Sequence, residues 1–318
     1  MYSIFEIFTS VCLPILVLIV VGWGLDRKFS LDLRTLVKLN IYLFVPAFIL
    51  VKLSSSSIPG KTGALVMLFT VCIIASMGLV SWLVSRLRKD PPHDRAGLQL
   101  STMIYNSGNW GIPLLTLAFP DQGGVLQVFV LATMNLTTFT CGVFLATSTR
   151  EENVDSIWKN LLPIFKQPSV YAIATAIAFR VFGNPLDDIV FIWKPLNYIA
   201  AGLVGFALLT LGVQLSKTQP PRPVGRLGWA LGIRLLGGPA IAVGLTWLFG
   251  ISGTFAAILI VGAASPTAVN TALLAYEFGT DSRFAAAAVY YSTLSATVVV
   301  TLILAVLHAG WIPWAVPG

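Results

Sequence analysis

Long apolar stretches recur along the whole sequence, and they constrain the fold more than any other feature. The hydrocarbon core of a bilayer is ~30 Å thick and needs about 20 apolar residues in an α-helix. Charged residues make up only 10% of the chain, against about 25% in an ordinary soluble protein. The pattern therefore predicts an all-α polytopic membrane protein. Ten candidate spans can be read from the sequence, at 4–25, 36–53, 62–85, 96–119, 123–148, 167–183, 191–216, 227–250, 253–276 and 284–307.

Lysine and arginine residues are divided unequally between alternate loops, and this bias predicts the orientation in the cell membrane. Loops rich in these residues stay in the cytoplasm, so both termini are expected to be extracytoplasmic. The same distribution explains the net charge of +7 without nucleic acid as a partner. The first span lacks the basic start of a signal peptide and is expected to be retained. Fifteen of the 20 basic residues lie in the loops after odd-numbered spans, namely Arg27, Lys28, Arg34, Lys38, Arg86, Arg88, Lys89, Arg95, Arg150, Lys159, Lys166, Lys217, Arg222, Arg226 and Arg283.

The longest predicted loop, a cytoplasmic connection at 149–166, divides the ten spans into two sets of five. We therefore predict a first five-helix repeat at 1–148 and a second at 167–318. An odd number of helices in each half makes the halves enter the membrane in opposite directions, as in the inverted repeats of many secondary transporters. Weak internal similarity agrees, since a Leu-Asn pair opens the second span of each half, at 39–40 and 196–197.

Spans four and nine contain residues that break helices near their middle. Span four contains Tyr-Asn-Ser-Gly-Asn-Trp-Gly-Ile-Pro at 105–113, and span nine contains Gly-Ala-Ala-Ser-Pro-Thr-Ala-Val-Asn-Thr at 262–271. Proline removes a backbone donor, and glycine lowers the cost of leaving the helix. Such breaks are tolerated in a bilayer only where protein or a water-lined cavity covers them. Their matching places in the two halves favour a transport site, whereas simple kinks are expected at Pro14, Pro46 and Pro239.

The chemistry of a broken helix favours an anion. The second half-helix begins at mid-membrane, where its free amides and dipole stabilise negative charge by about 0.3–1 kcal/mol, or up to ~2 kcal/mol when partly buried. Two such ends facing each other suit a carboxylate, and Asn106, Asn109, Thr267 and Asn270 add neutral donors. Neutral donors avoid the large desolvation cost of a permanent cation inside the membrane.

Several segments together resemble one family of membrane transporters. They are Asn-Ser-Gly-Asn-Trp-Gly-Ile-Pro-Leu-Leu at 106–115, Ala-Ser-Pro-Thr-Ala-Val-Asn-Thr at 264–271, Ala-Tyr-Glu-Phe-Gly-Thr-Asp at 275–281 and Tyr-Ser-Thr-Leu at 291–294. The chain resembles the auxin efflux carriers over its whole length, and its short central connection is similar to that of the prokaryotic members. One departure is that Tyr105 stands where the plant motif has proline before the crossover asparagine, here Asn106.

The resemblance implies a fold and a mechanism. It implies ten helices in two inverted five-helix repeats, with broken helices four and nine crossing each other. Helices one, two, six and seven would form a scaffold that makes a homodimer, and helices 3–5 and 8–10 would form a transport domain that moves as an elevator. The implied substrates are small organic anions such as auxin-like acids, malonate or malate. The predicted substrate-binding residues are Asn106, Ser107, Gly108, Asn109, Gly111, Pro113, Pro266, Thr267, Ala268, Val269 and Asn270.

Arg234 lies inside the eighth span and has two interpretations. It could have an electrostatic role toward the anion, or it could extend to the membrane interface or bind helix-end carbonyls. The third, fourth, fifth, ninth and tenth spans contain no Asp, Glu, His or Lys, which argues against proton coupling through a buried carboxylate.

The remaining functional classes are an enzyme, a receptor or channel, and a different transporter. No metal-ligand cluster, cofactor motif or catalytic constellation is present in the sequence, so we predict no enzyme, no metal and no cofactor. The alternative within transporters is a sodium-coupled organic anion symporter of the bile-acid type. The predicted partners are therefore a small organic acid, the lipid bilayer and a second copy of the chain.

Overall fold

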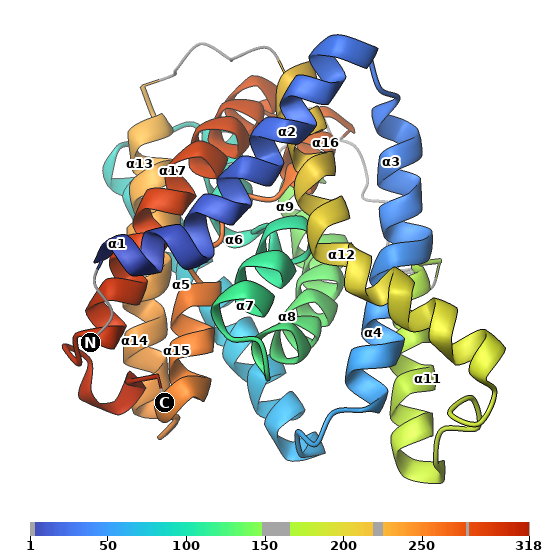
Figure 1. Ribbon diagram of the computed structural model, residues 1–318. Coiled ribbons are helices and arrows are strands. Elements are labelled where there is room, and N and C mark those ends of the chain that lie inside the picture. The colour runs from blue at the N-terminus through green and yellow to red at the C-terminus, as the bar shows by residue number, and fades with distance from the viewer. Residues whose placement is uncertain (1–3, 148–165, 219–224, 278–279, 318) are drawn as a thin grey trace.

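The computed structural model describes residues 4–147, 166–218, 225–277 and 280–317. The secondary structure of these residues is helical, without a single β-strand, which confirms the all-α class. The predicted connection at 149–166 lies, apart from Lys166, outside the described residues. Figure 1 shows the arrangement of the elements. In chain order they are α1 (Ile4–Ile7), the π-helical turn η1 (Phe8–Cys12), α2 (Leu13–Phe29), α3 (Leu33–Leu39), η2 (Asn40–Phe44), α4 (Val45–Ser54), α5 (Gly60–Leu87), α6 (Pro92–Met103), η3 (Ser107–Gly111), α7 (Ile112–Ala118), α8 (Gly123–Thr137), η4 (Thr138–Gly142), α9 (Val143–Thr147), α11 (Pro168–Phe182), α12 (Val190–Lys217), α13 (Leu227–Leu231), η5 (Gly232–Gly237), α14 (Gly238–Leu248), α15 (Gly253–Gly262), α16 (Val269–Glu277), α17 (Ser282–His308) and the 3₁₀ turn η6 (Pro313–Ala315).

Seven continuous helices in the described part are long and apolar enough to cross a membrane, by length and composition. This confirms a multi-pass membrane protein, whereas the count of ten spans stays a prediction. Two further apolar helices, Pro168–Phe182 and Gly253–Gly262, are shorter. The fourth and ninth predicted spans are each divided into two pieces, so neither piece reaches the required length. The seven are Ile4–Phe29, Leu33–Ser54, Gly60–Leu87, Gly123–Leu145, Val190–Lys217, Leu227–Leu248 and Ser282–His308.

Four prolines in the helices follow π-helical turns, whereas Pro195 lies within α12 without such a turn. Pro14, Pro46, Pro113 and Pro239 each occupy the second residue of an α-helix that begins directly after η1, η2, η3 or η5. A proline ring clashes with the preceding turn and removes one hydrogen bond. A π turn widens the helix locally, and such bulges are a recognised cause of bends. The chain thus accommodates these four prolines without leaving helical structure.

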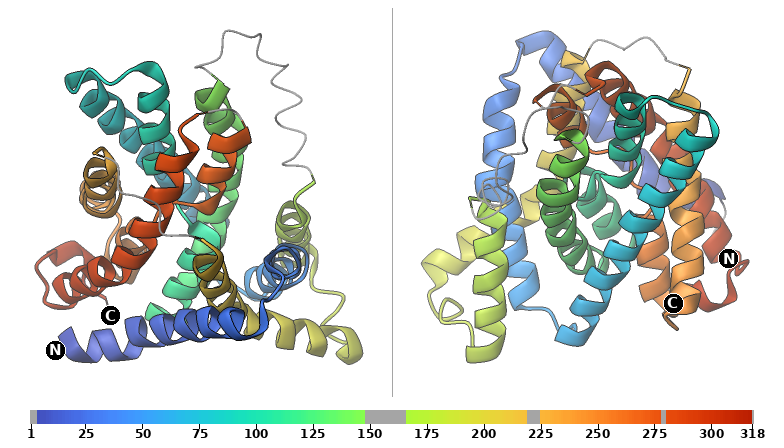
Figure 2. Two further views of the ribbon diagram at one scale, coloured as in Figure 1. Left: turned by 90° about the horizontal axis from the view of Figure 1, so that it is seen from above. Right: turned by 180° about the vertical axis from the view of Figure 1, so that it is seen from behind.

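The helices form two groups. The first helix group, α1–α4 with α11 and α12, lies along one edge of the molecule in the left view of Figure 2. Its most extensive contact is between α2 and α12, and α4 packs against α11 and α12. Gly22 and Gly212 permit this close approach, because a Cβ at either position would overlap a backbone carbonyl of the other helix. Phe44 and Phe206 stack with their ring centroids 4.2 Å apart.

The second helix group contains α5–α9 and α13–α17, with α5 packed against α6 and α8, α7 against α8, and α16 against α17. An ionic contact joins three helices of this second group. Arg226 precedes α13 and lies 2.9 Å from an Asp94 carboxylate oxygen in α6 and 2.7 Å from one of Asp281, the N-cap of α17. These three side chains link the ends of α6, α13 and α17.

The two ends of the described chain lie at the same end of the molecule and near each other (Figures 1 and 2). Polar contacts also join segments that the loop charges assign to one side of the membrane. Lys217, which follows the seventh predicted span, forms a salt bridge of 2.9 Å with Asp26, which follows the first. On the other side, the Arg180 guanidinium donates to the Ile58 carbonyl oxygen at 2.5 Å. The structure itself contains no membrane, so the orientation of the termini stays a prediction.

Candidate functional site

Two segments far apart in the sequence leave helical geometry and pair with each other. The first is 104–106, between α6 and η3, and the second is 263–268, between α15 and α16. An isolated antiparallel bridge joins Tyr105 to Thr267. The Asn106 N–H donates to the Pro266 carbonyl oxygen at 2.8 Å, and the Ala268 N–H donates to the Ile104 carbonyl oxygen at 3.0 Å. Backbone groups freed by one break are thus satisfied by the other, as an apolar environment requires.

The position of the first break differs from the position of the glycines and the proline that predicted it. Ser107–Gly111 form a π-helical turn and Pro113 lies in the first turn of α7, so these residues are helical. Proline is tolerated there because the first-turn amides have no intrahelical partner. The break precedes them, at 104–106, whereas the second break contains its predicted Pro266.

Asn106 is the N-cap of the half-helix that begins with η3. Its side-chain oxygen accepts the Asn109 N–H at 3.1 Å, and its main-chain oxygen accepts the Gly111 N–H at 3.0 Å. The residue is 8% exposed. Its Nδ2 amide group is buried and makes no hydrogen bond within the part of the chain that the structure describes. The crossover therefore contains an unpaired donor at the start of a half-helix.

Thr267 anchors the second break to two neighbouring helices. Its N–H donates to Ser292 Oγ of α17 at 3.0 Å, and its hydroxyl donates to the Ser101 carbonyl oxygen of α6 at 2.7 Å. Both of its donors are therefore used within the protein. The predicted role of Thr267 as a substrate donor is untested, and these bonds show a role in holding the crossover.

Gln127 of α8 supports the first break and was not among the predicted site residues. Its Nε2 donates to the Ser107 carbonyl oxygen at 2.9 Å. A Cβ at Gly111 would overlap this same nitrogen, which explains why a glycine fits there. The Oε1 atom of Gln127 is buried without a partner among the described residues. A glutamine in a predicted span without charged residues was the available sequence signal.

Asn109 connects the broken helix to the first helix group. Its side-chain oxygen accepts a hydrogen bond from Asn40 Nδ2 of η2 at 2.7 Å. Asn40 is 1% exposed. The pairing of residues so far apart in the chain is a property of the fold. The Leu-Asn pair at 39–40 was evidence only for internal similarity and did not indicate this contact.

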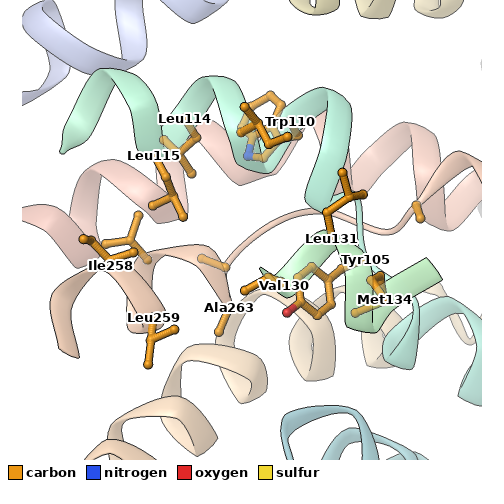
Figure 3. Close-up of a cluster of buried hydrophobic side chains, with 14 of the residues drawn as sticks. Tyr105, Trp110, Leu114, Leu115, Val130, Leu131, Met134, Ile258, Leu259 and Ala263 are labelled. Atoms are coloured by element: carbon orange, nitrogen blue, oxygen red, sulfur yellow. The ribbon is translucent and has the colours of Figure 1, made fainter. Parts of the chain in front are cut away.

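Arg234 is fully buried, at 0% exposure, so the prediction that it extends to the membrane interface is wrong. The alternative of binding helix-end carbonyls is what the structure shows. Nη1 donates to the Thr102 carbonyl oxygen at 2.7 Å, and Nη2 donates to the carbonyl oxygen of Ala263. The guanidinium lies over the Tyr105 ring, 4.6 Å from its centroid. Figure 3 shows Tyr105 and Ala263 in one cluster of buried side chains, with Val130, Leu259 and other apolar residues around them.

The predicted site residues all lie at the two breaks or in the turns that follow them, but they differ in exposure. Gly108, Asn109 and Val269 are half-buried, and Asn270 is exposed. The buried members are Asn106, Ser107, Gly111, Pro113, Pro266, Thr267 and Ala268. A pocket of about 430 Å³ lies elsewhere, at the far end of α7, and contains none of them in its lining. Within the described ranges, no three His, Cys, Asp or Glu side chains are grouped to hold a metal ion.

Comparison with known proteins identifies the family. The sequence profile of the family described as "Membrane transport protein" matches residues 7–304, which is nearly the whole chain. A protein named "Uncharacterized transporter" from Methanothermobacter thermautotrophicus (strain Delta H) is 25% identical over 291 residues, covering 90% of this chain and 94% of its own. A transporter family agrees with the prediction that the chain is not an enzyme. The chain belongs to this membrane transport protein family, the auxin efflux carrier family that its fourth and ninth predicted spans resemble.

Proposed function

We propose that this protein is a secondary transporter that binds the carboxylate of a small organic anion at the crossover of its two broken helices. The observation that carries this proposal is the buried, unpaired Nδ2 group of Asn106. A buried donor without a partner costs about 1–3 kcal/mol, and a bound carboxylate would remove that cost. The donor lies at the start of a half-helix, where the dipole also favours negative charge.

Further unpaired donors lie in the first turns of both second half-helices. The Trp110 indole nitrogen in η3 and the Thr271 hydroxyl in α16 are buried without partners in the described structure. These groups are neutral, so they can bind an anion while the empty site carries no added charge. Small acids such as malonate, malate or auxin-like acids present the carboxylate that such donors suit.

The proposed movement is an elevator motion of the second helix group against the first. The ionic contact of Arg226 with Asp94 and Asp281 supports a second group that moves as one body. The close packing of α2 on α12 supports a first helix group that stays fixed. This first helix group is also the proposed contact between the two copies of a homodimer. The proposal includes ten spans in two inverted repeats, at 1–148 and 167–318, with both termini outside the cell.

Counterflow in vesicles tests the function directly. Vesicles that contain the purified protein are loaded with unlabelled malonate, malate or indole acetate. They should take up the same labelled acid faster than protein-containing vesicles without internal acid, and the uptake should saturate. A current that rises linearly with concentration would indicate a channel and contradict the proposal. Replacement of sodium by potassium should leave the rate of exchange unchanged. Loss of exchange in potassium would favour the sodium-coupled symporter.

A further inference from the structure

A buried cation occupies the place where two half-helices end. The Arg234 guanidinium donates to the carbonyl oxygens of Thr102 and Ala263. Thr102 belongs to the last turn of α6, and Ala263 is the residue that directly follows α15. One side chain therefore bridges the C-terminal ends of both first half-helices.

The electrostatics of this place favour a cation. The last carbonyls of a helix have no intrahelical partner and carry the negative end of its dipole. Transporters with broken helices use such C-terminal ends and unwound carbonyls to coordinate sodium ions or protons. No salt bridge joins Arg234 to an acid within the described residues. Carbonyl oxygens and the Tyr105 ring are thus the groups that stabilise its charge.

The helix that carries Arg234 also leaves space for the guanidinium. Gly238 lies one turn after Arg234, and a Cβ there would lie 2.6 Å from the Ala263 carbonyl oxygen and 2.5 Å from Nη2. A Cβ at the adjacent Gly237 would meet no atom closer than 3.9 Å. Glycine therefore leaves the space that the guanidinium and the Ala263 carbonyl group share.

We infer that Arg234 supplies, as a fixed part of the chain, the positive charge that a bound coupling cation supplies in other carriers with crossed broken helices. The inference rests on the proposed function in so far as it assigns this charge to balancing a bound organic anion. A fixed cation at the C-terminal ends balances an anion at the nearby N-terminal ends, so no sodium ion has to enter the site. It follows that sodium neither drives transport nor stabilises the protein.

Chemical rescue tests the cation site without any transport substrate. Arg234→Ala should lower the Tm of the purified protein by more than about 5 °C, because carbonyl groups at both helix ends lose a charged donor. Ethylguanidinium should restore much of that Tm, whereas ethylurea, which has a similar shape and no charge, should not. Arg180→Ala is the matched control, because Arg180 is half-buried and donates to one loop carbonyl; ethylguanidinium should leave its Tm unchanged.

A second pair of variants covers the case in which Arg234→Ala does not fold. Arg234→Lys should retain a higher Tm than Arg234→Met, which has a similar length and no charge. Equal losses in both variants, or equal rescue of Arg234→Ala by ethylguanidinium and ethylurea, would overturn the inference. So would a Tm of the wild type that rises in sodium over potassium chloride. None of these readouts depends on the substrate, so failure here is distinct from failure of counterflow.

Discussion

The Asn40 side-chain amide donates to the side-chain oxygen of Asn109 at 2.7 Å, which joins the first helix group to the first broken helix. A second side-chain hydrogen bond between the groups runs from the Thr301 hydroxyl to Cys12 Sγ at 3.0 Å. An elevator motion slides one group past the other, so it has to break both bonds. The Asn40–Asn109 pair lies beside the proposed carboxylate site, because the Asn109 N–H binds Asn106.

A cross-link at this pair should stop transport. In a background with Cys12, Cys72 and Cys141 replaced by alanine, Asn40→Cys with Asn109→Cys should react with a short bifunctional thiosulfonate reagent. Exchange in vesicles should then fall to background and return after reduction. Each single cysteine variant treated in the same way is the control. Full exchange by cross-linked protein would contradict a sliding motion at this contact.

Close packing of α2 on α12 predicts a stability difference between two glycines of one helix. Gly212→Ala would place a methyl group on the Ile19 carbonyl oxygen, whereas Gly205→Ala meets no atom within 4 Å. Overpacking of this kind costs about 1–3 kcal/mol. We expect a Tm several degrees lower for Gly212→Ala and an unchanged or higher Tm for Gly205→Ala, by thermal unfolding in detergent. Equal Tm values for the two variants would argue against this helix contact.

The space around the Arg234 guanidinium predicts a contrast between adjacent residues. Gly238→Ala should lower the Tm, because its Cβ would crowd the Ala263 carbonyl oxygen at 2.6 Å. Gly237→Ala should be neutral or slightly stabilising, since alanine favours helix over glycine by up to ~1 kcal/mol. Thermal unfolding of the two purified variants measures both effects, and the reverse order would contradict the placement of Arg234.

Loop charges predict which residues face outward. Ser57 lies in the segment before α5 and Lys28 in the last turn of α2, and both are exposed. The charge bias assigns them to opposite sides of the membrane. In the cysteine-free background, Ser57→Cys should react with an impermeant thiol reagent added to intact cells. Lys28→Cys should react only after the cells are opened. The opposite pattern would reverse the assignment of every loop.

Much of the fold follows from the apolar pattern, because a bilayer leaves the backbone few alternatives to helices. The positions of the helix breaks were less predictable. Gly111 and Pro113 indicated a break within the fourth span, but a π turn and a first-turn position keep both residues helical. Such a turn depends on what packs around it, as Gln127 does against Gly111.

The candidate site was partly predictable for a similar reason. Asn106 could be found from its place in the motif and from its residue type. Asn40, Gln127 and Ser292, which bind Asn109, Ser107 and Thr267, come from distant helices. Local sequence patterns do not show which of these residues will meet. The direction of a long side chain also depends on its surroundings. The sequence therefore did not show whether Arg234 would extend to the membrane interface or stay in the protein interior.

Binding by an Asn106 variant tests the central claim most directly. Affinity for the best of a panel of mono- and dicarboxylates would be measured on purified wild type, Asn106→Ala and Asn197→Ala. Asn197 is the control, because its amide donates within its own helix to the Trp193 carbonyl oxygen. Removal of a hydrogen bond to a charged acceptor costs about 1.5–3 kcal/mol of binding free energy. This cost corresponds to a ~10- to 150-fold loss of affinity.

We therefore expect that loss for Asn106→Ala, a larger one for Asn106→Asp because its carboxylate repels the anion, and little change for Asn197→Ala. A lower Tm alone would mean that Asn106 only caps η3 through the Asn109 N–H. A well-folded Asn106→Ala protein that binds its acid as tightly as the wild type would contradict the account.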